Sequence, residues 1–191
     1  HQIYRDIYND SLWLINLVEN LLSVTRITKG EIQLHLTAEL MDEVVAEALR
    51  HVGRQSAEHT IRVISSDDLI LAKIDAKLMV QVVINIVDNA IKYTPPGSTI
   101  TISTEKRQDK VVVKIADDGP GVPDEAKPRI FDMFYTGAGK IADSRRSLGL
   151  GLALCKSIID AHGGTLSVSD NKPHGAVFTF TLQAEEVDLH E

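Results

Sequence analysis

"NIVDNAIKYTPPG", from Asn85 to Gly97, places two asparagines one helical turn apart in a largely apolar segment. Asparagine is a poor helix former because its side-chain amide competes for backbone hydrogen bonds. A helix from Asp75 to Tyr93, at about 100° per residue, would gather its polar side chains on one side: Gln81, Asn85, Asp88, Asn89 and Lys92. Its other side is apolar, and Asp75 can cap its first turn. The sequence thus predicts a helix that buries one side and exposes a polar stripe.

The polar stripe has two interpretations. Charged and polar helix faces are usually solvated surface. Solvated faces favour Glu, Lys, Gln and Ala, however, whereas Asn85 and Asn89 beside Lys92 offer neutral oxygens for a hard cation and a point charge for phosphate. The stripe alone does not distinguish a solvated surface from a ligand site, so the other motifs of the chain are needed.

The segment IADDGPGV is predicted to end a strand at Asp117, just before Gly119 and Gly121. Glycines let the backbone approach a ligand closely, although a tight turn explains them equally well. The acidic Asp117 would repel phosphate, but a carboxylate can accept a hydrogen bond from an exocyclic amine such as that of adenine. This loop therefore favours a base pocket over a phosphate cradle.

The segment SLGLGLALCKSIIDAHGG predicts a helix from about Leu148 to His162, with Gly149 and Gly151 at its start. The free amides of a helix N-terminus suit an anionic phosphate, and close helix packing is the alternative. A dinucleotide-binding fingerprint is disfavoured because these glycines follow a polar loop and a third glycine is absent. The sequence also lacks a P-loop and the motifs of eukaryotic-type protein kinases.

The rest of the chain alternates predicted strands and helices, with adjacent hairpins. We expect strands at 32–37, 60–66 and 69–75, two strands within 98–118, a helix at 38–52 and a closing hairpin from 165–170 and 176–183. This order predicts an α/β two-layer sandwich, a mixed sheet with helices on one face. Before it, apolar residues spaced three, four or seven apart from Ile3 to Val24 predict a long bundle-type helix that ends at Lys29-Gly30. That helix could instead pack on its own domain.

The overall composition excludes several classes of protein. A formal charge of −7 over 191 residues argues against a nucleic acid as partner. With Cys155 as the single cysteine, no intrachain disulfide can form, which suits a reducing compartment. No apolar run approaches the roughly 20 residues that cross a bilayer. The chain opens at His1 without methionine, so we expect a piece of a longer protein, with any membrane segment in the missing part.

In this order, N-x-x-x-N-A-x-K-Y, D-x-G-x-G, IFDMFY and G-L-G-L-A resemble the N, G1, F and G2 boxes of the sensor histidine kinases. These kinases belong to the wider GHKL family, with the Hsp90-type and MutL-type ATPases. The resemblance covers about Ile32 to Gln183 and implies the Bergerat-type ATP-binding fold. It implies an incomplete second helix of the dimerisation and phosphotransfer hairpin at 1–30, a catalytic domain at 31–185 and a tail at 186–191. GPGVPDEAKPRIFDMFYTG and PHGAVFTFTL are similar to the potassium-responsive, Kdp-type sensor kinases.

The resemblance implies ATP and Mg²⁺ as ligands. By analogy Asn89 coordinates Mg²⁺ and Asn85 assists it, Lys92 and Tyr93 contact phosphates, and Asp117 accepts from the adenine amine beside Gly119 and Gly121. The triphosphate-binding G2 box corresponds to Leu148, Gly149, Leu150 and Gly151. Phosphate contacts from a lid are expected from Lys140, Arg145 or Arg146, each of which could instead be an ordinary surface charge. Phe131 and Phe134 are expected to anchor the hinge of that lid.

The resemblance also implies the reaction, with Asn85, Asn89 and Lys92 as catalytic residues. The chain would transfer the γ-phosphoryl of ATP to a histidine on an upstream hairpin, for relay to the receiver domain of a response regulator. Hydrolytic relatives carry a glutamate at the position of Asn85, and an amide cannot take a proton at neutral pH. We therefore expect poor hydrolysis, which disfavours a GHKL-type ATPase. A non-catalytic, nucleotide-gated dimerisation module is the other alternative.

Two departures from the family pattern matter. The G2 box begins with Arg146-Ser147-Leu148 where the family usually has more glycine, so the basic residue that meets the γ-phosphate is open. No S-H-E-L-R-like phosphoacceptor segment occurs, and His1 is not assigned that role. The other histidines are expected to be structural or surface residues. The parent protein is expected to be a homodimer anchored in the bacterial inner membrane, with this chain as a cytoplasmic domain.

Overall fold

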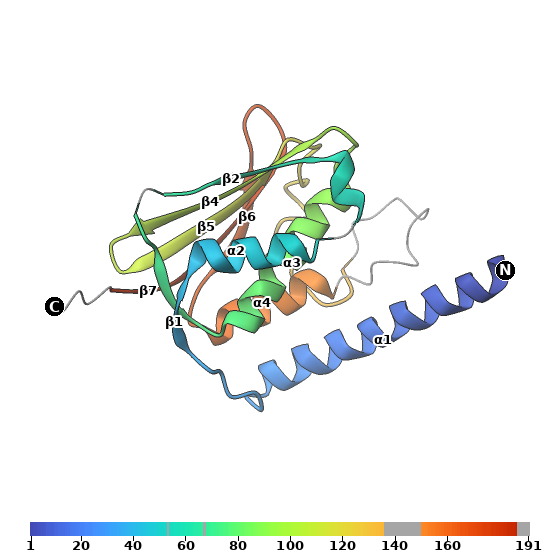
Figure 1. The fold of residues 1–191 in the computed structure, drawn as a ribbon, viewed down its shortest axis with the longest axis horizontal. Coiled ribbons are helices and arrows are strands. Elements are labelled where there is room, and N and C mark those ends of the chain that lie inside the picture. Colours follow the sequence, from blue (N-terminus) through green and yellow to red (C-terminus); the bar gives the residue numbers. More distant parts are fainter. Residues whose placement is uncertain (53, 67, 136–149, 187–191) are drawn as a thin grey trace.

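A mixed sheet forms one layer of the structure and a set of helices covers one face of it (Figure 1). The computed structural model describes residues 1–52, 54–66, 68–135 and 150–186. The strands are β1 (Thr37–Leu40), β2 (Thr60–Ile64), β3 (Leu71–Ile74), β4 (Thr99–Arg107), β5 (Lys110–Asp117), β6 (Leu166–Asp170) and β7 (Ala176–Glu185). The helices are α1 (Gln2–Thr28), α2 (Met41–Arg50), α3 (Ala76–Tyr93), α4 (Gly151–Ala161) and the 3-10 helix η1 (Arg54–Glu58).

The strand order among the described residues is β1-β3-β7-β5-β4-β2, and β6 also pairs with β7. Strand β2 runs parallel to β4, while the other described pairings are antiparallel. The predicted mixed sheet with helices on one face is therefore confirmed, as is the closing hairpin of β6 and β7. Because β5 lies between β4 and β7, its last residue, Asp117, ends in the middle of the sheet.

Helix α3 has the two sides that the sequence predicts. Asp75 is its N-cap, and the Asp75 carboxylate accepts a hydrogen bond of 3.3 Å from the backbone N–H of Leu78. The core side is fully or almost fully buried: Met79, Val82, Val83, Ile86, Val87, Ala90 and Ile91. Each large aliphatic side chain buried in this way contributes about 1.5–3 kcal/mol, which fixes the helix on the sheet and leaves the polar stripe at the edge of the core.

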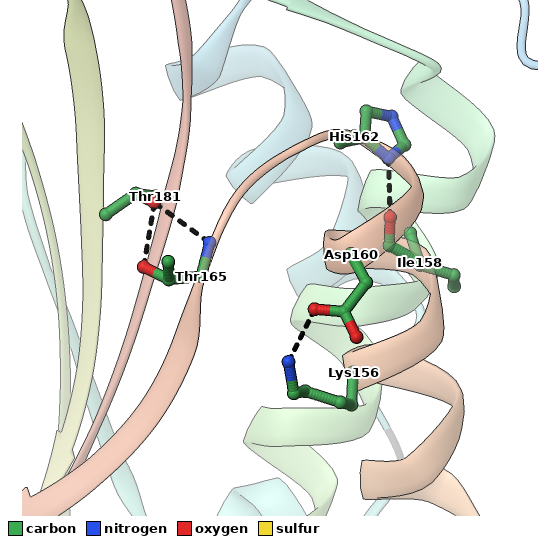
Figure 2. A network of polar contacts seen from close by, with 6 residues as sticks. All are labelled: Lys156, Ile158, Asp160, His162, Thr165 and Thr181. Carbon is green, nitrogen blue, oxygen red and sulfur yellow. Dashed lines mark hydrogen bonds and ion pairs between the residues drawn. The ribbon is translucent and has the colours of Figure 1, made fainter.

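His162 joins the end of α4 to the start of α3. Its Nδ1 donates to the carbonyl oxygen of Ile158 at 2.7 Å (Figure 2). Its Nε2 accepts from the backbone N–H of Asp75 at 3.1 Å. Both bonds together require a neutral ring with its proton on Nδ1. A few residues after α4, the Thr165 backbone N–H donates to Thr181 Oγ1 at 3.0 Å. This bond attaches the segment that follows α4 to strand β7. His162 is a structural residue, as expected.

The predicted strand at 32–37 and helix at 38–52 are wrong in their boundaries. Strand β1 begins at Thr37 because its partner β3 has four residues, from Leu71 to Ile74, and the two pair in full. The alternation in the preceding segment has another cause: Ile32 packs against the core although it lies outside any strand. Helix α2 then begins at Met41, whose backbone N–H donates to the Ile70 carbonyl oxygen at 3.0 Å.

Helix α1 is partly packed and partly exposed. It ends at Thr28, followed by Gly30 with a φ of +68°, as the Lys29-Gly30 pair predicts. Its last turns bury Val24 and Ile27, and it contacts α4. Apolar side chains farther toward the N-terminus stay exposed: Ile3, Tyr4, Ile7, Tyr8, Leu12, Leu14, Ile15, Val18 and Leu22. A bundle partner for this face remains a prediction. No described helix combines the length and the apolar character needed to span a membrane.

Cys155 carries a testable pH dependence. It lies fully buried in α4, its Sγ donates to the Val82 carbonyl oxygen of α3 at 3.6 Å, and burial raises the pKa of the thiol from 9.0 to about 12. Above pH 9 the unfolded chain releases this proton and the folded chain keeps it. The free energy of unfolding should therefore fall by about 1.4 kcal/mol per pH unit from this residue alone.

Urea unfolding of the wild type and of Cys155→Ala, measured from pH 8 to about pH 11, checks this expectation. The alanine variant is less stable at pH 8 because it leaves a small cavity. Its disadvantage should shrink as the pH rises. A constant difference between the two proteins across this range would contradict the assignment.

Candidate functional site

The polar stripe of α3 lies next to the start of α4. Gln81 Nε2 donates to Asn85 Oδ1 at 2.8 Å, and Asn85 Nδ2 donates to the Gly151 carbonyl oxygen at 3.4 Å. Asn85 is thus held at both ends of its amide. Asn89 differs, because no side-chain hydrogen bond among the described residues involves its amide. Its carbonyl oxygen is available to a ligand, whereas Asn85 Oδ1 keeps one lone pair beside the Gln81 bond.

The end of α3 places a cation beside an aromatic ring. Lys92 is exposed, and its Nζ lies 5.5 Å from the centroid of the Tyr93 ring. That distance is within the range of a cation–π contact. Tyr93 is 52% exposed, so both side chains can reach a ligand above the stripe. A flexible ammonium group at this position suits an anionic ligand such as phosphate.

Asp117 is a nearly buried carboxylate with one end free. The residue is 6% exposed, and its Oδ1 accepts from the backbone N–H groups of Gly119 at 3.0 Å and Ala176 at 3.2 Å. Within the described part of the chain, no fully buried side-chain nitrogen or oxygen lacks a hydrogen-bond partner. Since Oδ2 has no partner there, it must reach the surface. Asp117 therefore presents one fixed acceptor outward from the end of β5.

Gly119 lets the Asp117 loop lie directly on the end of α3. A Cβ at Gly119 would lie 2.5 Å from the Thr94 Cγ2 methyl and 3.2 Å from Asp117 Oδ1. Thr94 is 8% exposed and held by a 2.7 Å hydrogen bond from its Oγ1 to the Ala90 carbonyl oxygen, so it cannot easily yield. The glycine thus brings together two motifs that are far apart in the sequence.

Gly121 and Gly151 have different surroundings. Gly121 adopts a φ of +78°, a conformation that a side chain disfavours. Gly151 begins α4 next to buried Leu150, and a Cβ there would meet no atom within 4 Å. Close packing therefore does not explain Gly151, since no described atom occupies the space above it. The expected phosphate contacts at Lys140, Arg145, Arg146, Leu148 and Gly149 lie outside the described residues.

The two phenylalanines of the IFDMFY segment have different roles. Phe131 is half-buried, and its ring packs edge-on against Phe178 of β7 with centroids 6.2 Å apart. It anchors the segment, as predicted. Phe134 is 55% exposed and has a φ of +63°. The prediction that Phe134 is an anchor is wrong, because the chain turns there in the left-handed region and the side chain remains largely in solvent.

Sequence reasoning missed the residues that support Asp117 from behind. Asn171 Nδ2 donates to the Asp117 backbone carbonyl at 2.8 Å, and Gly175 packs against the same backbone. The predicted hairpin of β6 and β7 gave a signal that 171–175 is a turn. The sequence of this turn does not indicate that it contacts the Asp117 loop, because the two segments are more than fifty residues apart in the chain.

The donor set limits how a metal could bind. Among the described residues no group of three His, Cys, Asp or Glu side chains could hold a metal ion. A metal at the α3 stripe would depend on amide oxygens and on the oxygens of its ligand. Mg²⁺ commonly binds in this way, through few protein groups together with phosphates and water. The free Asn89 amide fits that role.

Comparison with known proteins identifies the family of the chain. Residues 74–186 match the family described as histidine kinase-, DNA gyrase B- and HSP90-like ATPases. The sensor protein KdpD of Clostridium acetobutylicum is 42% identical over 184 residues, which cover 96% of this chain and 20% of that protein. The chain therefore spans about a fifth of the length of this relative.

Two solved structures show the same fold. The full-length ShkA structure in complex with AMPPNP has a TM-score of 0.79 and 25% identity, over 93% of this chain and 37% of that one. The histidine kinase ThkA in complex with the response regulator protein TrrA has a TM-score of 0.66 and 27% identity, over 90% of this chain and 49% of that one. Together with the family match, these relatives show that the chain belongs to the histidine kinase-, DNA gyrase B- and HSP90-like ATPase family, and within it to the sensor histidine kinases.

Proposed function

We propose that this chain binds Mg-ATP and transfers its γ-phosphoryl group to a histidine on an upstream hairpin of the parent protein. The observation that carries the proposal is the Asp117 carboxylate, which is fixed by two backbone amides and presents its second oxygen outward from a loop that packs on Thr94 at the end of α3. A fixed acceptor at the end of a helix that carries two asparagine amides and a lysine is suited to a purine base at one end and a metal-bound polyphosphate at the other.

Each group has a distinct role in this proposal. Asp117 Oδ2 accepts from the exocyclic amine of adenine. Asn89 supplies an oxygen to Mg²⁺, with Asn85 as the second amide, and Lys92 and Tyr93 contact the phosphates. The start of α4 at Gly151, next to Leu150, faces the triphosphate. Lys140, Arg145 or Arg146 in the lid segment completes the phosphate contacts, with Leu148 and Gly149 at its end.

Asn85 determines the fate of the γ-phosphoryl group. Its amide is held by Gln81 and Gly151 and has no basic nitrogen, so it cannot remove a proton from water. ATP is therefore held for an external nucleophile. Phosphoryl transfer requires mainly positioning and charge neutralisation: an imidazole nitrogen forms a bond to the γ-phosphorus, the bond to the β,γ-bridging oxygen breaks, and ADP leaves.

The decisive experiment mixes this chain with the separately expressed upstream hairpin and ATP labelled at the γ-phosphate. Label on histidine, stable to base and labile to acid, is the expected result. Bound nucleotide without any transferred label would instead support a nucleotide-gated dimerisation module. Rapid release of labelled phosphate without transfer would support an ATPase.

The Asn89→Ala variant tests the metal assignment. Removing this amide oxygen should abolish the part of ATP affinity that depends on Mg²⁺ and leave the metal-free affinity nearly unchanged. Titration calorimetry of ATP, with Mg²⁺ and with EDTA, measures both. Lys77→Ala is a matched control, because Lys77 is an exposed residue in the first turn of the same helix. If Asn89→Ala keeps the full enhancement by Mg²⁺, Asn89 is not a ligand.

The partners follow from the same proposal. Because ThkA has been solved with a response regulator, we propose that the phosphoryl group passes on to the receiver domain of a response regulator. The exposed apolar face of α1 would complete a dimeric hairpin bundle in a homodimeric parent. We propose that this parent is anchored in the bacterial inner membrane, with the present chain on its cytoplasmic side.

A further inference from the structure

The turn between β6 and β7, residues 171–175, lies against the back of the Asp117 loop. Asn171 Nδ2 donates to the Asp117 carbonyl oxygen at 2.8 Å, and His174 Nδ1 donates to the Gly119 carbonyl oxygen at 3.1 Å. The carbonyl groups of the residues before and after Asp118 thus accept hydrogen bonds from two side chains of one turn that is distant in the sequence. These contacts act on the backbone that carries the carboxylate and leave its outer oxygen free.

The residue that follows this turn contacts the carboxylate directly. Ala176 follows the turn, and its backbone N–H donates to Asp117 Oδ1 at 3.2 Å. Gly175 lies so close to the Asp117 backbone that a Cβ would be 2.7 Å from its carbonyl carbon. Any shift of the turn would therefore move one of the two amides that orient the carboxylate.

Asn171 is the residue that closes the turn. Its backbone N–H donates to the Gly175 carbonyl oxygen at 2.9 Å, and its Oδ1 accepts from the Lys172 backbone N–H at 2.9 Å. Its remaining amide group points across to Asp117. One side chain thus fixes the shape of the turn and the distance between the turn and the Asp117 loop.

We propose that Asn171 is a positioning residue for recognition of the nucleotide base: it holds Asp117 so that Oδ2 is aimed at the exocyclic amine. This inference rests on the proposed ATP site and adds to it a determinant of base selectivity that comes from the turn between β6 and β7. Asn171 acts through the Asp117 backbone, because its amide donates to the Asp117 carbonyl oxygen. Loss of Asn171 should therefore reduce the preference for nucleotides that carry the exocyclic amine, and it should not change the affinity for the triphosphate part of the ligand.

The test compares two ligands that differ only at this amine: ATP and purine riboside triphosphate, which lacks it. The wild type should bind ATP about tenfold more tightly, the worth of one charge-assisted hydrogen bond. In Asn171→Ala, ATP should bind several-fold more weakly and the analogue should bind as before, so the ratio of the two affinities should approach one. Titration calorimetry with Mg²⁺ present measures both constants.

Two further variants complete the experiment. Gln183→Ala removes a bond of the same type, from Gln183 Nε2 to the Asp109 carbonyl oxygen at 3.1 Å, at the far end of β5, and should keep the wild-type ratio. Asn171→Ser serves if the alanine variant unfolds. A serine hydroxyl can replace the amide within such a turn, but it is too short to reach Asp117, so the ratio should again fall.

The outcomes separate this inference from the proposed function. A wild type that does not bind ATP, or that binds both nucleotides equally, refutes the proposed base pocket itself. A wild type that discriminates, combined with Asn171 variants that discriminate equally well, overturns only the role of Asn171. Equal weakening of both nucleotides in Asn171→Ala also overturns it, because that result indicates a general distortion of the site.

Discussion

Gly175→Ala is expected to lower the free energy of unfolding by about 3 kcal/mol or more and to remove nucleotide binding. Gly175 has a φ of +114°, where a side chain is strained. In addition, its Cβ would collide with the Asp117 carbonyl oxygen and lie 3.0 Å from the Asp118 Cα. Because the obstacle is backbone at the end of a central strand, it cannot swing aside. The Asp117 loop must move, and its carboxylate moves with it.

Gly163→Ala provides the matched control for this variant. Gly163 also has a positive φ, +71°, but a Cβ there would meet nothing within 4 Å. The Gly163→Ala variant should lose only the free energy of unfolding that corresponds to the strained backbone conformation, about 1–2 kcal/mol. It should retain ATP binding. Urea unfolding and titration calorimetry on both variants measure the two effects. Equal losses of stability in the two variants would mean that the close contact between Gly175 and Asp117 does not add to the cost of the Gly175 substitution.

Asp117→Asn should weaken ATP binding by about 1.5–3 kcal/mol, the range for a hydrogen bond to a charged group, which is at least tenfold. The asparagine oxygen can still accept from the backbone amides of Gly119 and Ala176, so the loop keeps its shape. The amide nitrogen then occupies the place of Oδ2, and a donor faces the donor amine of adenine. Calorimetric titration of Mg-ATP gives the affinity directly.

Asp118→Asn is the control for the loss of one negative charge in this loop. The Asp118 carboxylate accepts from the Thr99 backbone N–H at 2.8 Å. An asparagine oxygen can replace that acceptor, so ATP affinity should change little. An Asp117→Asn protein with wild-type affinity, or an Asp118→Asn protein with an equal loss, would remove Asp117 from the base pocket.

The fold was predictable where the local pattern and the tertiary structure agree. The two-sided composition of α3 and its Asp75 cap are both confirmed, because apolar spacing and capping chemistry are local properties. The boundaries around β1 were wrong because the length of that strand depends on the length of β3, a partner more than thirty residues away. Alternation in the sequence cannot distinguish a paired strand from an extended segment that packs one side on the core.

The sequence indicates the candidate residues of the site but not the contacts that support them. The amides of α3, Asp117 and the glycines stand out because each breaks a local preference. The sequence could not reveal that Asn171 and Gly175 fix Asp117. Asn and Gly are common in turns whether or not they contact another segment, so their presence in a turn does not indicate such a contact. Nor could it reveal that Phe134 turns outward while Phe131 packs on Phe178.

The central claim is that the stripe of α3, the Asp117 loop and the start of α4 form one Mg-ATP site. Titration of the isotope-labelled chain with Mg-ATP, followed by NMR of the backbone amides, tests it most directly. The account predicts that the signals of Asn89, Gly119 and Gly151 shift together along one saturation curve, while the signal of Gly163, at the far end of α4, stays in place. Shifts that saturate at different concentrations, or no shift in folded protein, would contradict it.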